Sequence, residues 1–230
     1  MKTISVLQNT DAEHLGLVED HLEGRNIRFR YIRPAHDNKW IDNLSLPSDG
    51  LIILGAAPYG TVSDPKLPML EQRVEIIENY LSEKLPILAF GTGTQLLALA
   101  SGSTVKSREL TLDLQTARRV DDDALNGHLP VRYPIVTYMR DFPVIAQDAR
   151  VLSVFDDDTA ALFQISDNCL GFIGHPGMKS AMIEDSMVQM PAFDVANIDI
   201  LENIRNLQPE IEKSLISIMT GVIQITGWMN

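Results

Sequence analysis

Cysteine is almost absent from this sequence of 230 residues, which contains a single thiol, Cys169. One cysteine cannot form an intrachain disulfide or a thiolate metal cluster. Histidine is also scarce, and its five positions show no close-spaced metal motif: His14, His21, His36, His128 and His175. The sequence therefore predicts no metal site, and we expect no cofactor.

Basic residues are few as well. Nineteen lysines and arginines stand against 31 aspartates and glutamates, which gives a net charge of -12 and an isoelectric point near 4.7. Because this charge repels a phosphate backbone, nucleic acid is not an expected partner. Two acidic triplets, 121–123 and 156–158, are either cation sites or solvated turns. We favour turns, because no further ligand spacing accompanies either triplet.

Long apolar runs are also lacking. No run reaches the roughly 18 residues that a membrane-spanning helix needs, and residues 1–9 show no secretory cleavage pattern. Hydrophobic residues make up 45% and charged residues 22% of the chain, which is typical of an ordinary globular protein. We therefore expect a cytoplasmic protein without a membrane partner, long enough for one large domain with a well-buried core.

The first hundred residues alternate between strand and helix patterns. Short apolar runs bounded by turn residues predict strands, and apolar residues at helical spacing predict helices. Strands are expected at residues 4–8, 27–32, 51–54 and 86–90, and helices at 12–23, 68–84 and 94–100. Such regular alternation indicates parallel β-α-β units, in which helices cover both faces of a sheet.

After Gly102 the pattern changes to strands joined by short turns, which indicates antiparallel hairpins added to the parallel sheet. These strands are expected at residues 110–120, 135–139, 150–155, 159–165 and 169–173. A helical stretch follows at 197–228, with an interruption near Pro209. Its second half carries a wide apolar stripe, formed by Ile211, Leu215, Ile218, Met219, Val222 and Ile225.

We divide the chain into a domain of residues 1–192 and a C-terminal helical extension of residues 193–230. The apolar stripe must be covered, because so wide an apolar surface does not remain in water. Either the extension packs on the domain's own sheet, or it lies at an interface in a homodimer or larger oligomer. The sequence leaves both arrangements open.

The segment PILAFGTGTQLLA, at residues 86–98, is the most informative one. A buried strand stops at glycine and a helix begins at once, as in a nucleophile elbow that lifts one side chain clear of the sheet. The start of the helix offers unpaired N–H groups and a positive dipole end, which suit a developing oxyanion. A tight β-α turn whose glycines serve packing alone explains the segment equally well.

This segment resembles the nucleophile region of the class I glutamine amidotransferases, especially the stand-alone GMP-synthase-like branch. There the strand leads into Gly-Ile-Cys-x-Gly-(His/Ala)-Gln-Leu-Leu-Ala, and the matching residues are Gly93, Gln95, Leu96, Leu97 and Ala98. Further similar stretches follow in the family's order, at residues 6–8, 16–20, 54–58 and 172–176. The resemblance covers about the first 190 residues. It implies an α/β, three-layer, flavodoxin-like fold with a mostly parallel sheet, antiparallel hairpins and a C-terminal helical extension.

The resemblance also implies where catalytic residues would lie. In the family a cysteine attacks the glutamine amide, a histidine relays the proton, and a glutamate two residues later orients the histidine. Here the histidine is His175, while Gly91 stands at the cysteine position and Gly177 at the glutamate position. Glycine provides neither a nucleophile nor a carboxylate. The positions implied to contact a ligand are Gly55, Ala56, Thr92 and Gln95.

Other residues are poor replacements for the missing nucleophile. Cys169 precedes His175 by six residues on the same expected strand, which separates the two by roughly 20 Å. Thr92 follows the elbow position, so its side chain should point elsewhere, and Thr94 is expected to cap the helix. We therefore predict that the protein does not hydrolyse glutamine by the family's mechanism.

Three functions fit these observations. We favour a glutamine amidotransferase-like protein that acts as a small-molecule binding or regulatory protein, with glutamine or a related compound as its ligand. The second function is an active amidotransferase or hydrolase of altered chemistry, which uses His175 with a non-cysteine nucleophile. The third is a structural partner protein. The expected protein partner is a second copy of the chain or a separate synthetase-type protein.

Overall fold

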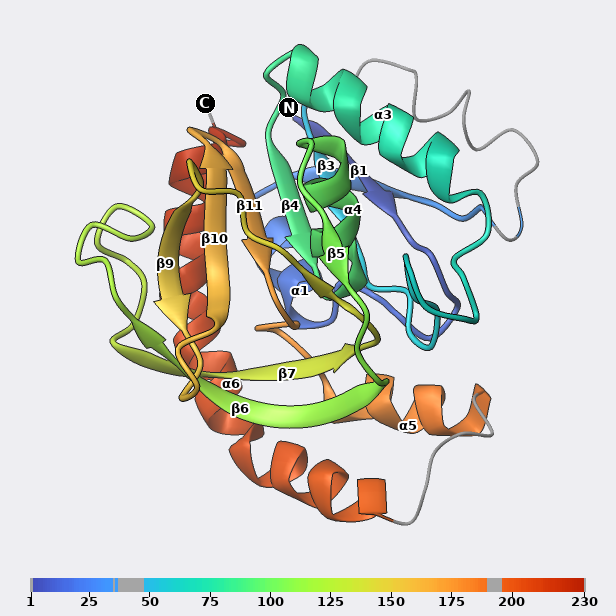
Figure 1. Ribbon diagram of the computed structural model, residues 1–230. Helices are drawn as coiled ribbons and strands as arrows, with labels where there is room; N and C mark the ends of the chain where they lie inside the picture. The colour runs from blue at the N-terminus through green and yellow to red at the C-terminus, as the bar shows by residue number, and fades with distance from the viewer. Residues whose placement is uncertain (1, 35, 37–47, 190–195, 230) are drawn as a thin grey trace.

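One large sheet lies between two layers of helices in the computed structural model, which describes residues 2–34, 36, 48–189 and 196–229 (Figure 1). The nine strands of this sheet follow the order β2-β1-β3-β4-β11-β10-β9-β6-β7, and a separate pair joins β5 to β8. The helices are α1 (Leu17–Glu23), α3 (Leu70–Ser82), α4 (Thr92–Ala100), α5 (Ser180–Gln189) and α6 (Ala196–Thr226).

The strands divide into a parallel half and an antiparallel half. Neighbours from β2 to β11 are parallel, and neighbours from β11 to β7 are antiparallel. The strands are β1 (Thr3–Leu7), β2 (Arg28–Ile32), β3 (Leu51–Ile53), β4 (Ile87–Phe90), β5 (Val105–Lys106), β6 (Thr111–Arg119), β7 (Arg132–Met139), β8 (Phe142–Pro143), β9 (Arg150–Val154), β10 (Ala160–Ser166) and β11 (Cys169–Phe172). The expected α/β fold, a parallel sheet extended by antiparallel hairpins, is confirmed.

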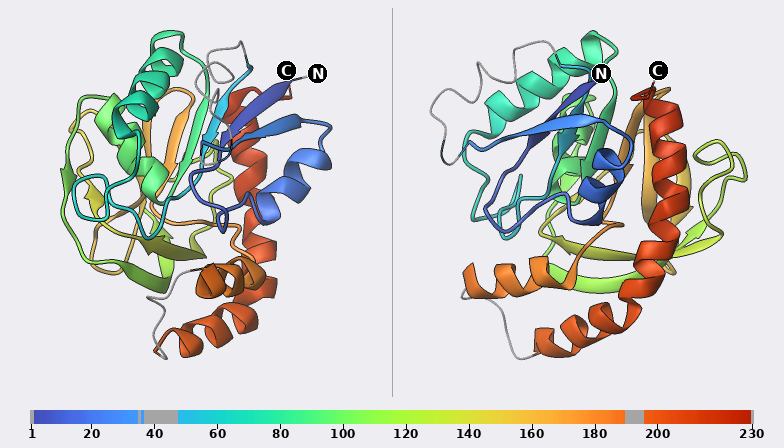
Figure 2. Two further views of the ribbon diagram at one scale, coloured as in Figure 1. Left: turned by 90° about the vertical axis from the view of Figure 1, so that its right-hand side faces the viewer. Right: turned by 180° about the vertical axis from the view of Figure 1, so that it is seen from behind.

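Helices cover both faces of the parallel half. Figure 1 and Figure 2 show α3 and α4 on one face, and α1 and the C-terminal half of α6 on the other. Every residue of β3, β4 and β11 is buried as a result, which explains why these strands are continuous apolar runs rather than alternating ones. Because Phe90 of β4 pairs with Phe172 of β11, the two strands end side by side.

Two predicted helix starts were wrong. The helix expected at residues 12–23 begins only at Leu17, because the preceding Gly16 has φ 59° and ψ -130°, a conformation outside the helical region. Residues 12–16 therefore form a connection rather than a helical turn. The helix after β4 begins at Thr92, with Gly91 as its N-cap. Thr94 is not the cap; its hydroxyl donates a hydrogen bond of 2.6 Å to the Gly91 carbonyl from inside the first turn.

The C-terminal helix has nearly the expected bounds but is not interrupted. Helix α6 continues through Pro209, and it bends along its length (Figure 1). Proline lacks one helical hydrogen bond and commonly kinks a helix without ending it when the flanking turns are packed. Helix α5 was not predicted at all. No helix among the described residues is both long enough and apolar enough to cross a membrane.

The apolar stripe of α6 is covered by the chain itself. Leu215, Ile218 and Val222 are fully buried, and they belong to the same core as the strands of the parallel sheet. Helix α6 packs against α1, β6 and β7. The stripe therefore does not require a second copy of the chain, and a homodimer stays a prediction without this support.

Candidate active-site region

The turn between β4 and α4 has the geometry of a nucleophile elbow. Gly91 is its single residue, with φ 51° and ψ -123°, a backbone conformation that side chains disfavour. Its N–H donates to the Phe172 carbonyl at 3.1 Å, which ties the elbow to the end of β11. A Cβ added at Gly91 would have only Gly55 Cα, at 3.7 Å, and Tyr138 O, at 3.9 Å, within 4 Å. There is thus room above Gly91 for the start of a side chain.

The loop after β3 lies against this elbow and holds a buried carboxylate. Ala57 N–H donates to Glu13 Oε1 at 3.0 Å, and the backbone of Gly55 donates to the same carboxylate. Burial raises the pKa of Glu13 to about 7, although the two backbone hydrogen bonds act in the opposite direction. The predicted ligand position Ala56 lies between the two donors and is buried.

His175 follows β11 and lies next to the elbow. Its backbone N–H donates to the Val136 carbonyl at 2.7 Å, and its ring stacks on Phe90 with 4.7 Å between the ring centroids. Nδ1 accepts a hydrogen bond from Gly177 N–H at 3.1 Å, and Nε2 lies 3.1 Å from the His14 carbonyl. A carbonyl only accepts, so these contacts assign the proton to Nε2. Both ring nitrogens are therefore engaged.

The protonation of His175 is also restricted by burial. Its side chain is almost fully buried, and burial lowers its pKa to about 4, against a weaker opposite effect of the His14 carbonyl. The ring is thus neutral near pH 7. A neutral imidazole whose only lone pair already accepts the Gly177 N–H has no free site to take a proton from an attacking group.

Gly177 lies at a crowded position, where a side chain would force its neighbours to shift. A Cβ there would lie 2.9 Å from Leu215 Cδ2 and 3.2 Å from Val18 Cγ2. The carbonyl of Gly177 accepts the Leu17 N–H at 2.9 Å, which fixes this turn to the start of α1. The Gly177 backbone N–H therefore orients His175, a role that the resemblance would assign to a glutamate side chain.

The two remaining predicted ligand positions lie on α4. Gln95 is fully buried; its amide accepts from Thr61 Oγ1 at 2.7 Å and donates to Arg140 O at 2.6 Å. Thr92 is also fully buried, and its hydroxyl has no hydrogen-bond partner among the described residues. The side chain of Gln95 thus links α4 to neighbouring loops, whereas the Thr92 hydroxyl makes no such link in the described chain.

Cys169 lies far from this region along the sheet. It begins β11 and pairs with Ile87 at the start of β4, whereas the elbow follows the ends of both strands. Burial raises its pKa, so the thiolate that a nucleophile requires is disfavoured. In the described parts of the chain, no group of three His, Cys, Asp or Glu side chains could hold a metal ion.

Two residues with important contacts were not among the predicted site residues. Glu13 was placed in a helical pattern, and the glycine at position 16 is the signal that the helix starts later. Asp141 accepts the backbone N–H groups of Thr61, Val62 and Ser63 at 2.9 to 3.0 Å. Burial acts to raise the pKa of Asp141, but these and further hydrogen bonds hold it below the usual range. Asp141 thus fixes the loop that carries the partner of Gln95.

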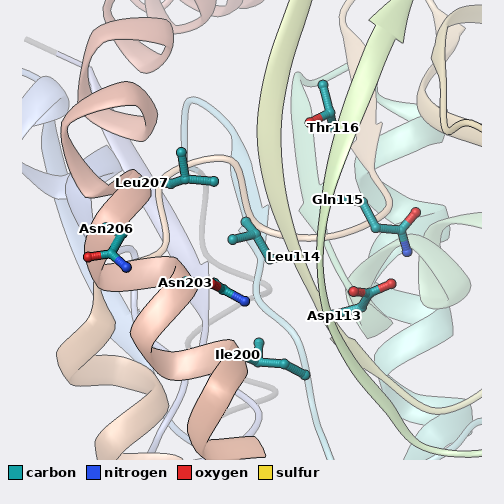
Figure 3. A pocket seen from close by; sticks show the side chains of 8 residues that line it. All are labelled: Asp113, Leu114, Gln115, Thr116, Ile200, Asn203, Asn206 and Leu207. Carbon is teal, nitrogen blue, oxygen red and sulfur yellow. The ribbon is translucent and has the colours of Figure 1, made fainter.

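A pocket of about 290 Å³ lies elsewhere, between β6 and the first half of α6 (Figure 3). Asp113 and Gln115 of β6 line it together with Ile200, Asn203 and Leu207 of α6. None of the residues that line this pocket belongs to the elbow, to the loop after β3 or to the turn of His175. It is therefore separate from the candidate active-site region.

Several crystal structures have the same architecture. A glutamine amidotransferase from Thermotoga maritima is 18% identical, with a TM-score of 0.80 over 98% of each chain. One from Methylobacillus flagellatus is 19% identical, with a TM-score of 0.81 over 98% of this chain and 95% of that one. A protein from Thermoplasma acidophilum, described as part of a putative GMP synthase, is 18% identical, with a TM-score of 0.60 over 91% of this chain and 98% of that one.

Comparison by sequence alone gives no relative. No protein-family model matches the chain, and no curated protein matches it. At identities below 20%, the structural similarity establishes the fold and leaves the activity to be argued from the residues. The chain thus has the three-layer fold of the glutamine amidotransferases, with an elbow that carries glycine.

Proposed function

We propose that this chain is a glutamine amidotransferase-like protein that binds a small molecule or acts in regulation, and that does not hydrolyse glutamine by the Cys-His-Glu mechanism. The observation that carries the proposal is Gly91. It forms the elbow, with φ 51° and ψ -123°, and it has no side chain with which to attack an amide.

The surroundings of His175 support the same conclusion. Its Nδ1 accepts a hydrogen bond from the Gly177 backbone and its Nε2 contacts the His14 carbonyl. A base for a threonine or water nucleophile would have to break one of these buried contacts first. We therefore do not favour an altered hydrolase that relies on His175.

Ligand binding is supported by what remains at the elbow. The space over Gly91 is bounded by Gly55 and Tyr138, and the start of α4 provides N–H groups that precede the first helical hydrogen bonds. The Thr92 hydroxyl, buried without a partner in the described chain, adds a polar group beside them. Glutamine or a related amino acid has the complementary acceptors. A synthetase-type partner is part of the proposal, because one structural neighbour is described as one component of a synthase.

Calorimetric titration of the purified protein with glutamine and with glutamate tests ligand binding. Gly91→Leu would fill the space over the elbow and should abolish binding. Gly102→Leu is the matched control, since Gly102 also has positive φ but a Cβ there meets nothing within 4 Å. Binding that survives Gly91→Leu, or no binding to the unmodified protein, would contradict a ligand site above the elbow.

A further inference from the structure

Glu13 is a buried carboxylate that the main chain of another loop holds. Glu13 is 6% exposed, and it forms no ion pair among the described residues. Its partners are the backbone N–H groups of Ala57, at 3.0 Å from Oε1, and of Gly55. Burying an acid away from cations is costly, and the two backbone hydrogen bonds offset part of that cost.

The loop is shaped around this carboxylate. A Cβ added at Gly55 would lie 1.9 Å from Glu13 Oε2 and 2.5 Å from its carboxyl carbon. Any side chain at Gly55 would therefore occupy the space that the carboxylate fills. We call the backbone of residues 55–57, with its two donors, the carboxylate cradle.

The cradle adjoins the elbow. A Cβ on Gly91 would contact Gly55 Cα at 3.7 Å, so the space over Gly91 and the cradle have Gly55 as a common wall. Tyr138 closes the far side: it packs with Ala57 and places its carbonyl 3.9 Å from that Cβ. A small molecule above Gly91 thus lies next to donors that already hold a carboxylate.

Glu13 can leave the cradle without disrupting an element. It lies on the connection between the end of β1, at Leu7, and the start of α1, at Leu17. Its neighbours Ala12 and Leu15 are fully buried and anchor the connection, so displacement of the Glu13 side chain would not have to move β1 or α1.

We propose that the carboxylate cradle is a binding site for the carboxylate group of a small molecule, which Glu13 fills from within the chain until such a ligand displaces it. This inference rests on the proposed ligand site above Gly91 and specifies the chemical class of the ligand. Amino acids and other small organic acids carry the group that the cradle accepts.

The first test is rescue by a small carboxylate. Glu13→Ala empties the cradle and leaves both N–H donors unpaired. Sodium acetate or formate should then raise the melting temperature of this variant saturably, by about 3 °C at ten times the dissociation constant. Unmodified protein and Glu13→Gln should respond only at higher concentrations, because the added carboxylate must first displace the side chain that fills the cradle. Equal responses of all three proteins, or no response of Glu13→Ala beyond that to chloride, would overturn the proposal.

The second test does not depend on the folding of Glu13→Ala. Carbon-13 NMR of the Glu13 carboxyl in unmodified protein should show a titration near the pKa of about 7 that burial produces. Gly55→Ala should expel the carboxylate and return its pKa to about 4.3, while the control Gly102→Ala leaves it unchanged. Glutamate added to the unmodified protein should shift the same carbon signal. An ordinary pKa in the unmodified protein, or a signal that does not respond to glutamate, would refute the displacement.

These outcomes are separable from those of the proposed function. Acetate rescue reports on the cradle alone and is unaffected by whether the protein hydrolyses glutamine. Conversely, suppose that Gly91→Leu abolishes ligand binding but Glu13→Ala shows no acetate rescue. That result would support the ligand site above Gly91 and contradict the carboxylate cradle.

Discussion

Glu13 and His175 are buried titratable side chains beside the elbow, and their pKa values are shifted in opposite directions. The pKa of Glu13 is raised to about 7 and that of His175 is lowered to about 4, in both cases mainly by burial. Both shifts favour the neutral form, as expected where charge is removed from water. Their effects on the pH dependence of stability therefore have opposite signs.

Glu13→Gln should stabilise the protein at alkaline pH. Between the ordinary glutamate pKa of 4.5 and the folded value of about 7, the native state keeps a proton that the unfolded state has lost. Stability therefore falls as the pH rises through this window, by about 3 kcal/mol in full. Because glutamine cannot ionise, urea unfolding of the variant and the unmodified protein should diverge between pH 5 and pH 8. Parallel curves would show that Glu13 has an ordinary pKa.

His175→Gln should remove a pH dependence of stability whose sign is opposite to that of Glu13. Between pH 6.5 and about 4 the unfolded state binds a proton that the native state rejects, so stability falls as the pH drops through that range. In the unmodified protein this slope opposes that of Glu13 between pH 4.5 and 6.5. Stability of Glu13→Gln should thus rise with pH in this window, while stability of His175→Gln falls. Unfolding free energies that change with pH in the same direction in both variants would contradict the two pKa shifts.

Sequence reasoning located some of these residues and missed the decisive contacts. Gly91 and His175 were identified because the flanking motif residues are specific. Glu13 was not, since a hydrophobic period does not show that Gly16 delays the helix. The proton position on His175 was equally out of reach, because it depends on the His14 carbonyl and the Gly177 N–H, which only the fold brings together.

At the scale of elements, the elbow should still activate a thiol. In Gly91→Cys the added Cβ meets no atom closer than 3.7 Å, although the positive φ strains any side chain there, and the N-terminus of α4 favours the thiolate. Its thiol pKa, measured by the pH dependence of iodoacetamide alkylation, should lie about one unit below the usual 8.5. Gly102→Cys, on an exposed turn, is the control, and the buried Cys169 should not react. Equal thiol pKa values in the two variants would argue against an elbow that can activate a nucleophile.

Helix α6 should act as part of the core. Leu215 is fully buried, and its side chain fills the space beside Gly177. Leu215→Ala should therefore reduce the free energy of unfolding by about 2 to 5 kcal/mol. The neighbouring Ile216 is 58% exposed, and Ile216→Ala should change it by less than about 0.5 kcal/mol. Urea unfolding gives both values. A loss of oligomers on light scattering, with unchanged stability of the protomer, would instead place the stripe at an interface.

The element pattern was predictable in type and less so in its ends. Apolar runs gave β3, β4 and β11 because buried parallel strands have no polar face. Pro209 was expected to interrupt the last helix, yet α6 continues through it, since the packing of the flanking turns is invisible in the local sequence. Helix α5 was missed because its apolar residues are spread over a short segment.

At the scale of the whole molecule, fold and activity separate. The parallel strands bring the ends of β3, β4 and β11 together at one edge, where α/β proteins commonly bind ligands. That architecture persists at 18 to 19% identity to glutamine amidotransferases. Under the proposed function, Gly91, Gly177 and the contacts of His175 depart from the catalytic arrangement that the resemblance implies. We therefore propose that the same scaffold presents a binding site here in place of a reaction.

The release of ammonia from glutamine by the purified protein is the most direct test of the proposed function. With glutamine labelled at the side-chain amide with nitrogen-15, ammonium formation can be followed by NMR at high protein concentration. We expect a rate equal to that of buffer, because the elbow has no nucleophile and both nitrogens of His175 are engaged. Turnover clearly above that background, co-purifying with the protein and abolished by Thr92→Ala or Glu13→Gln, would contradict the central claim.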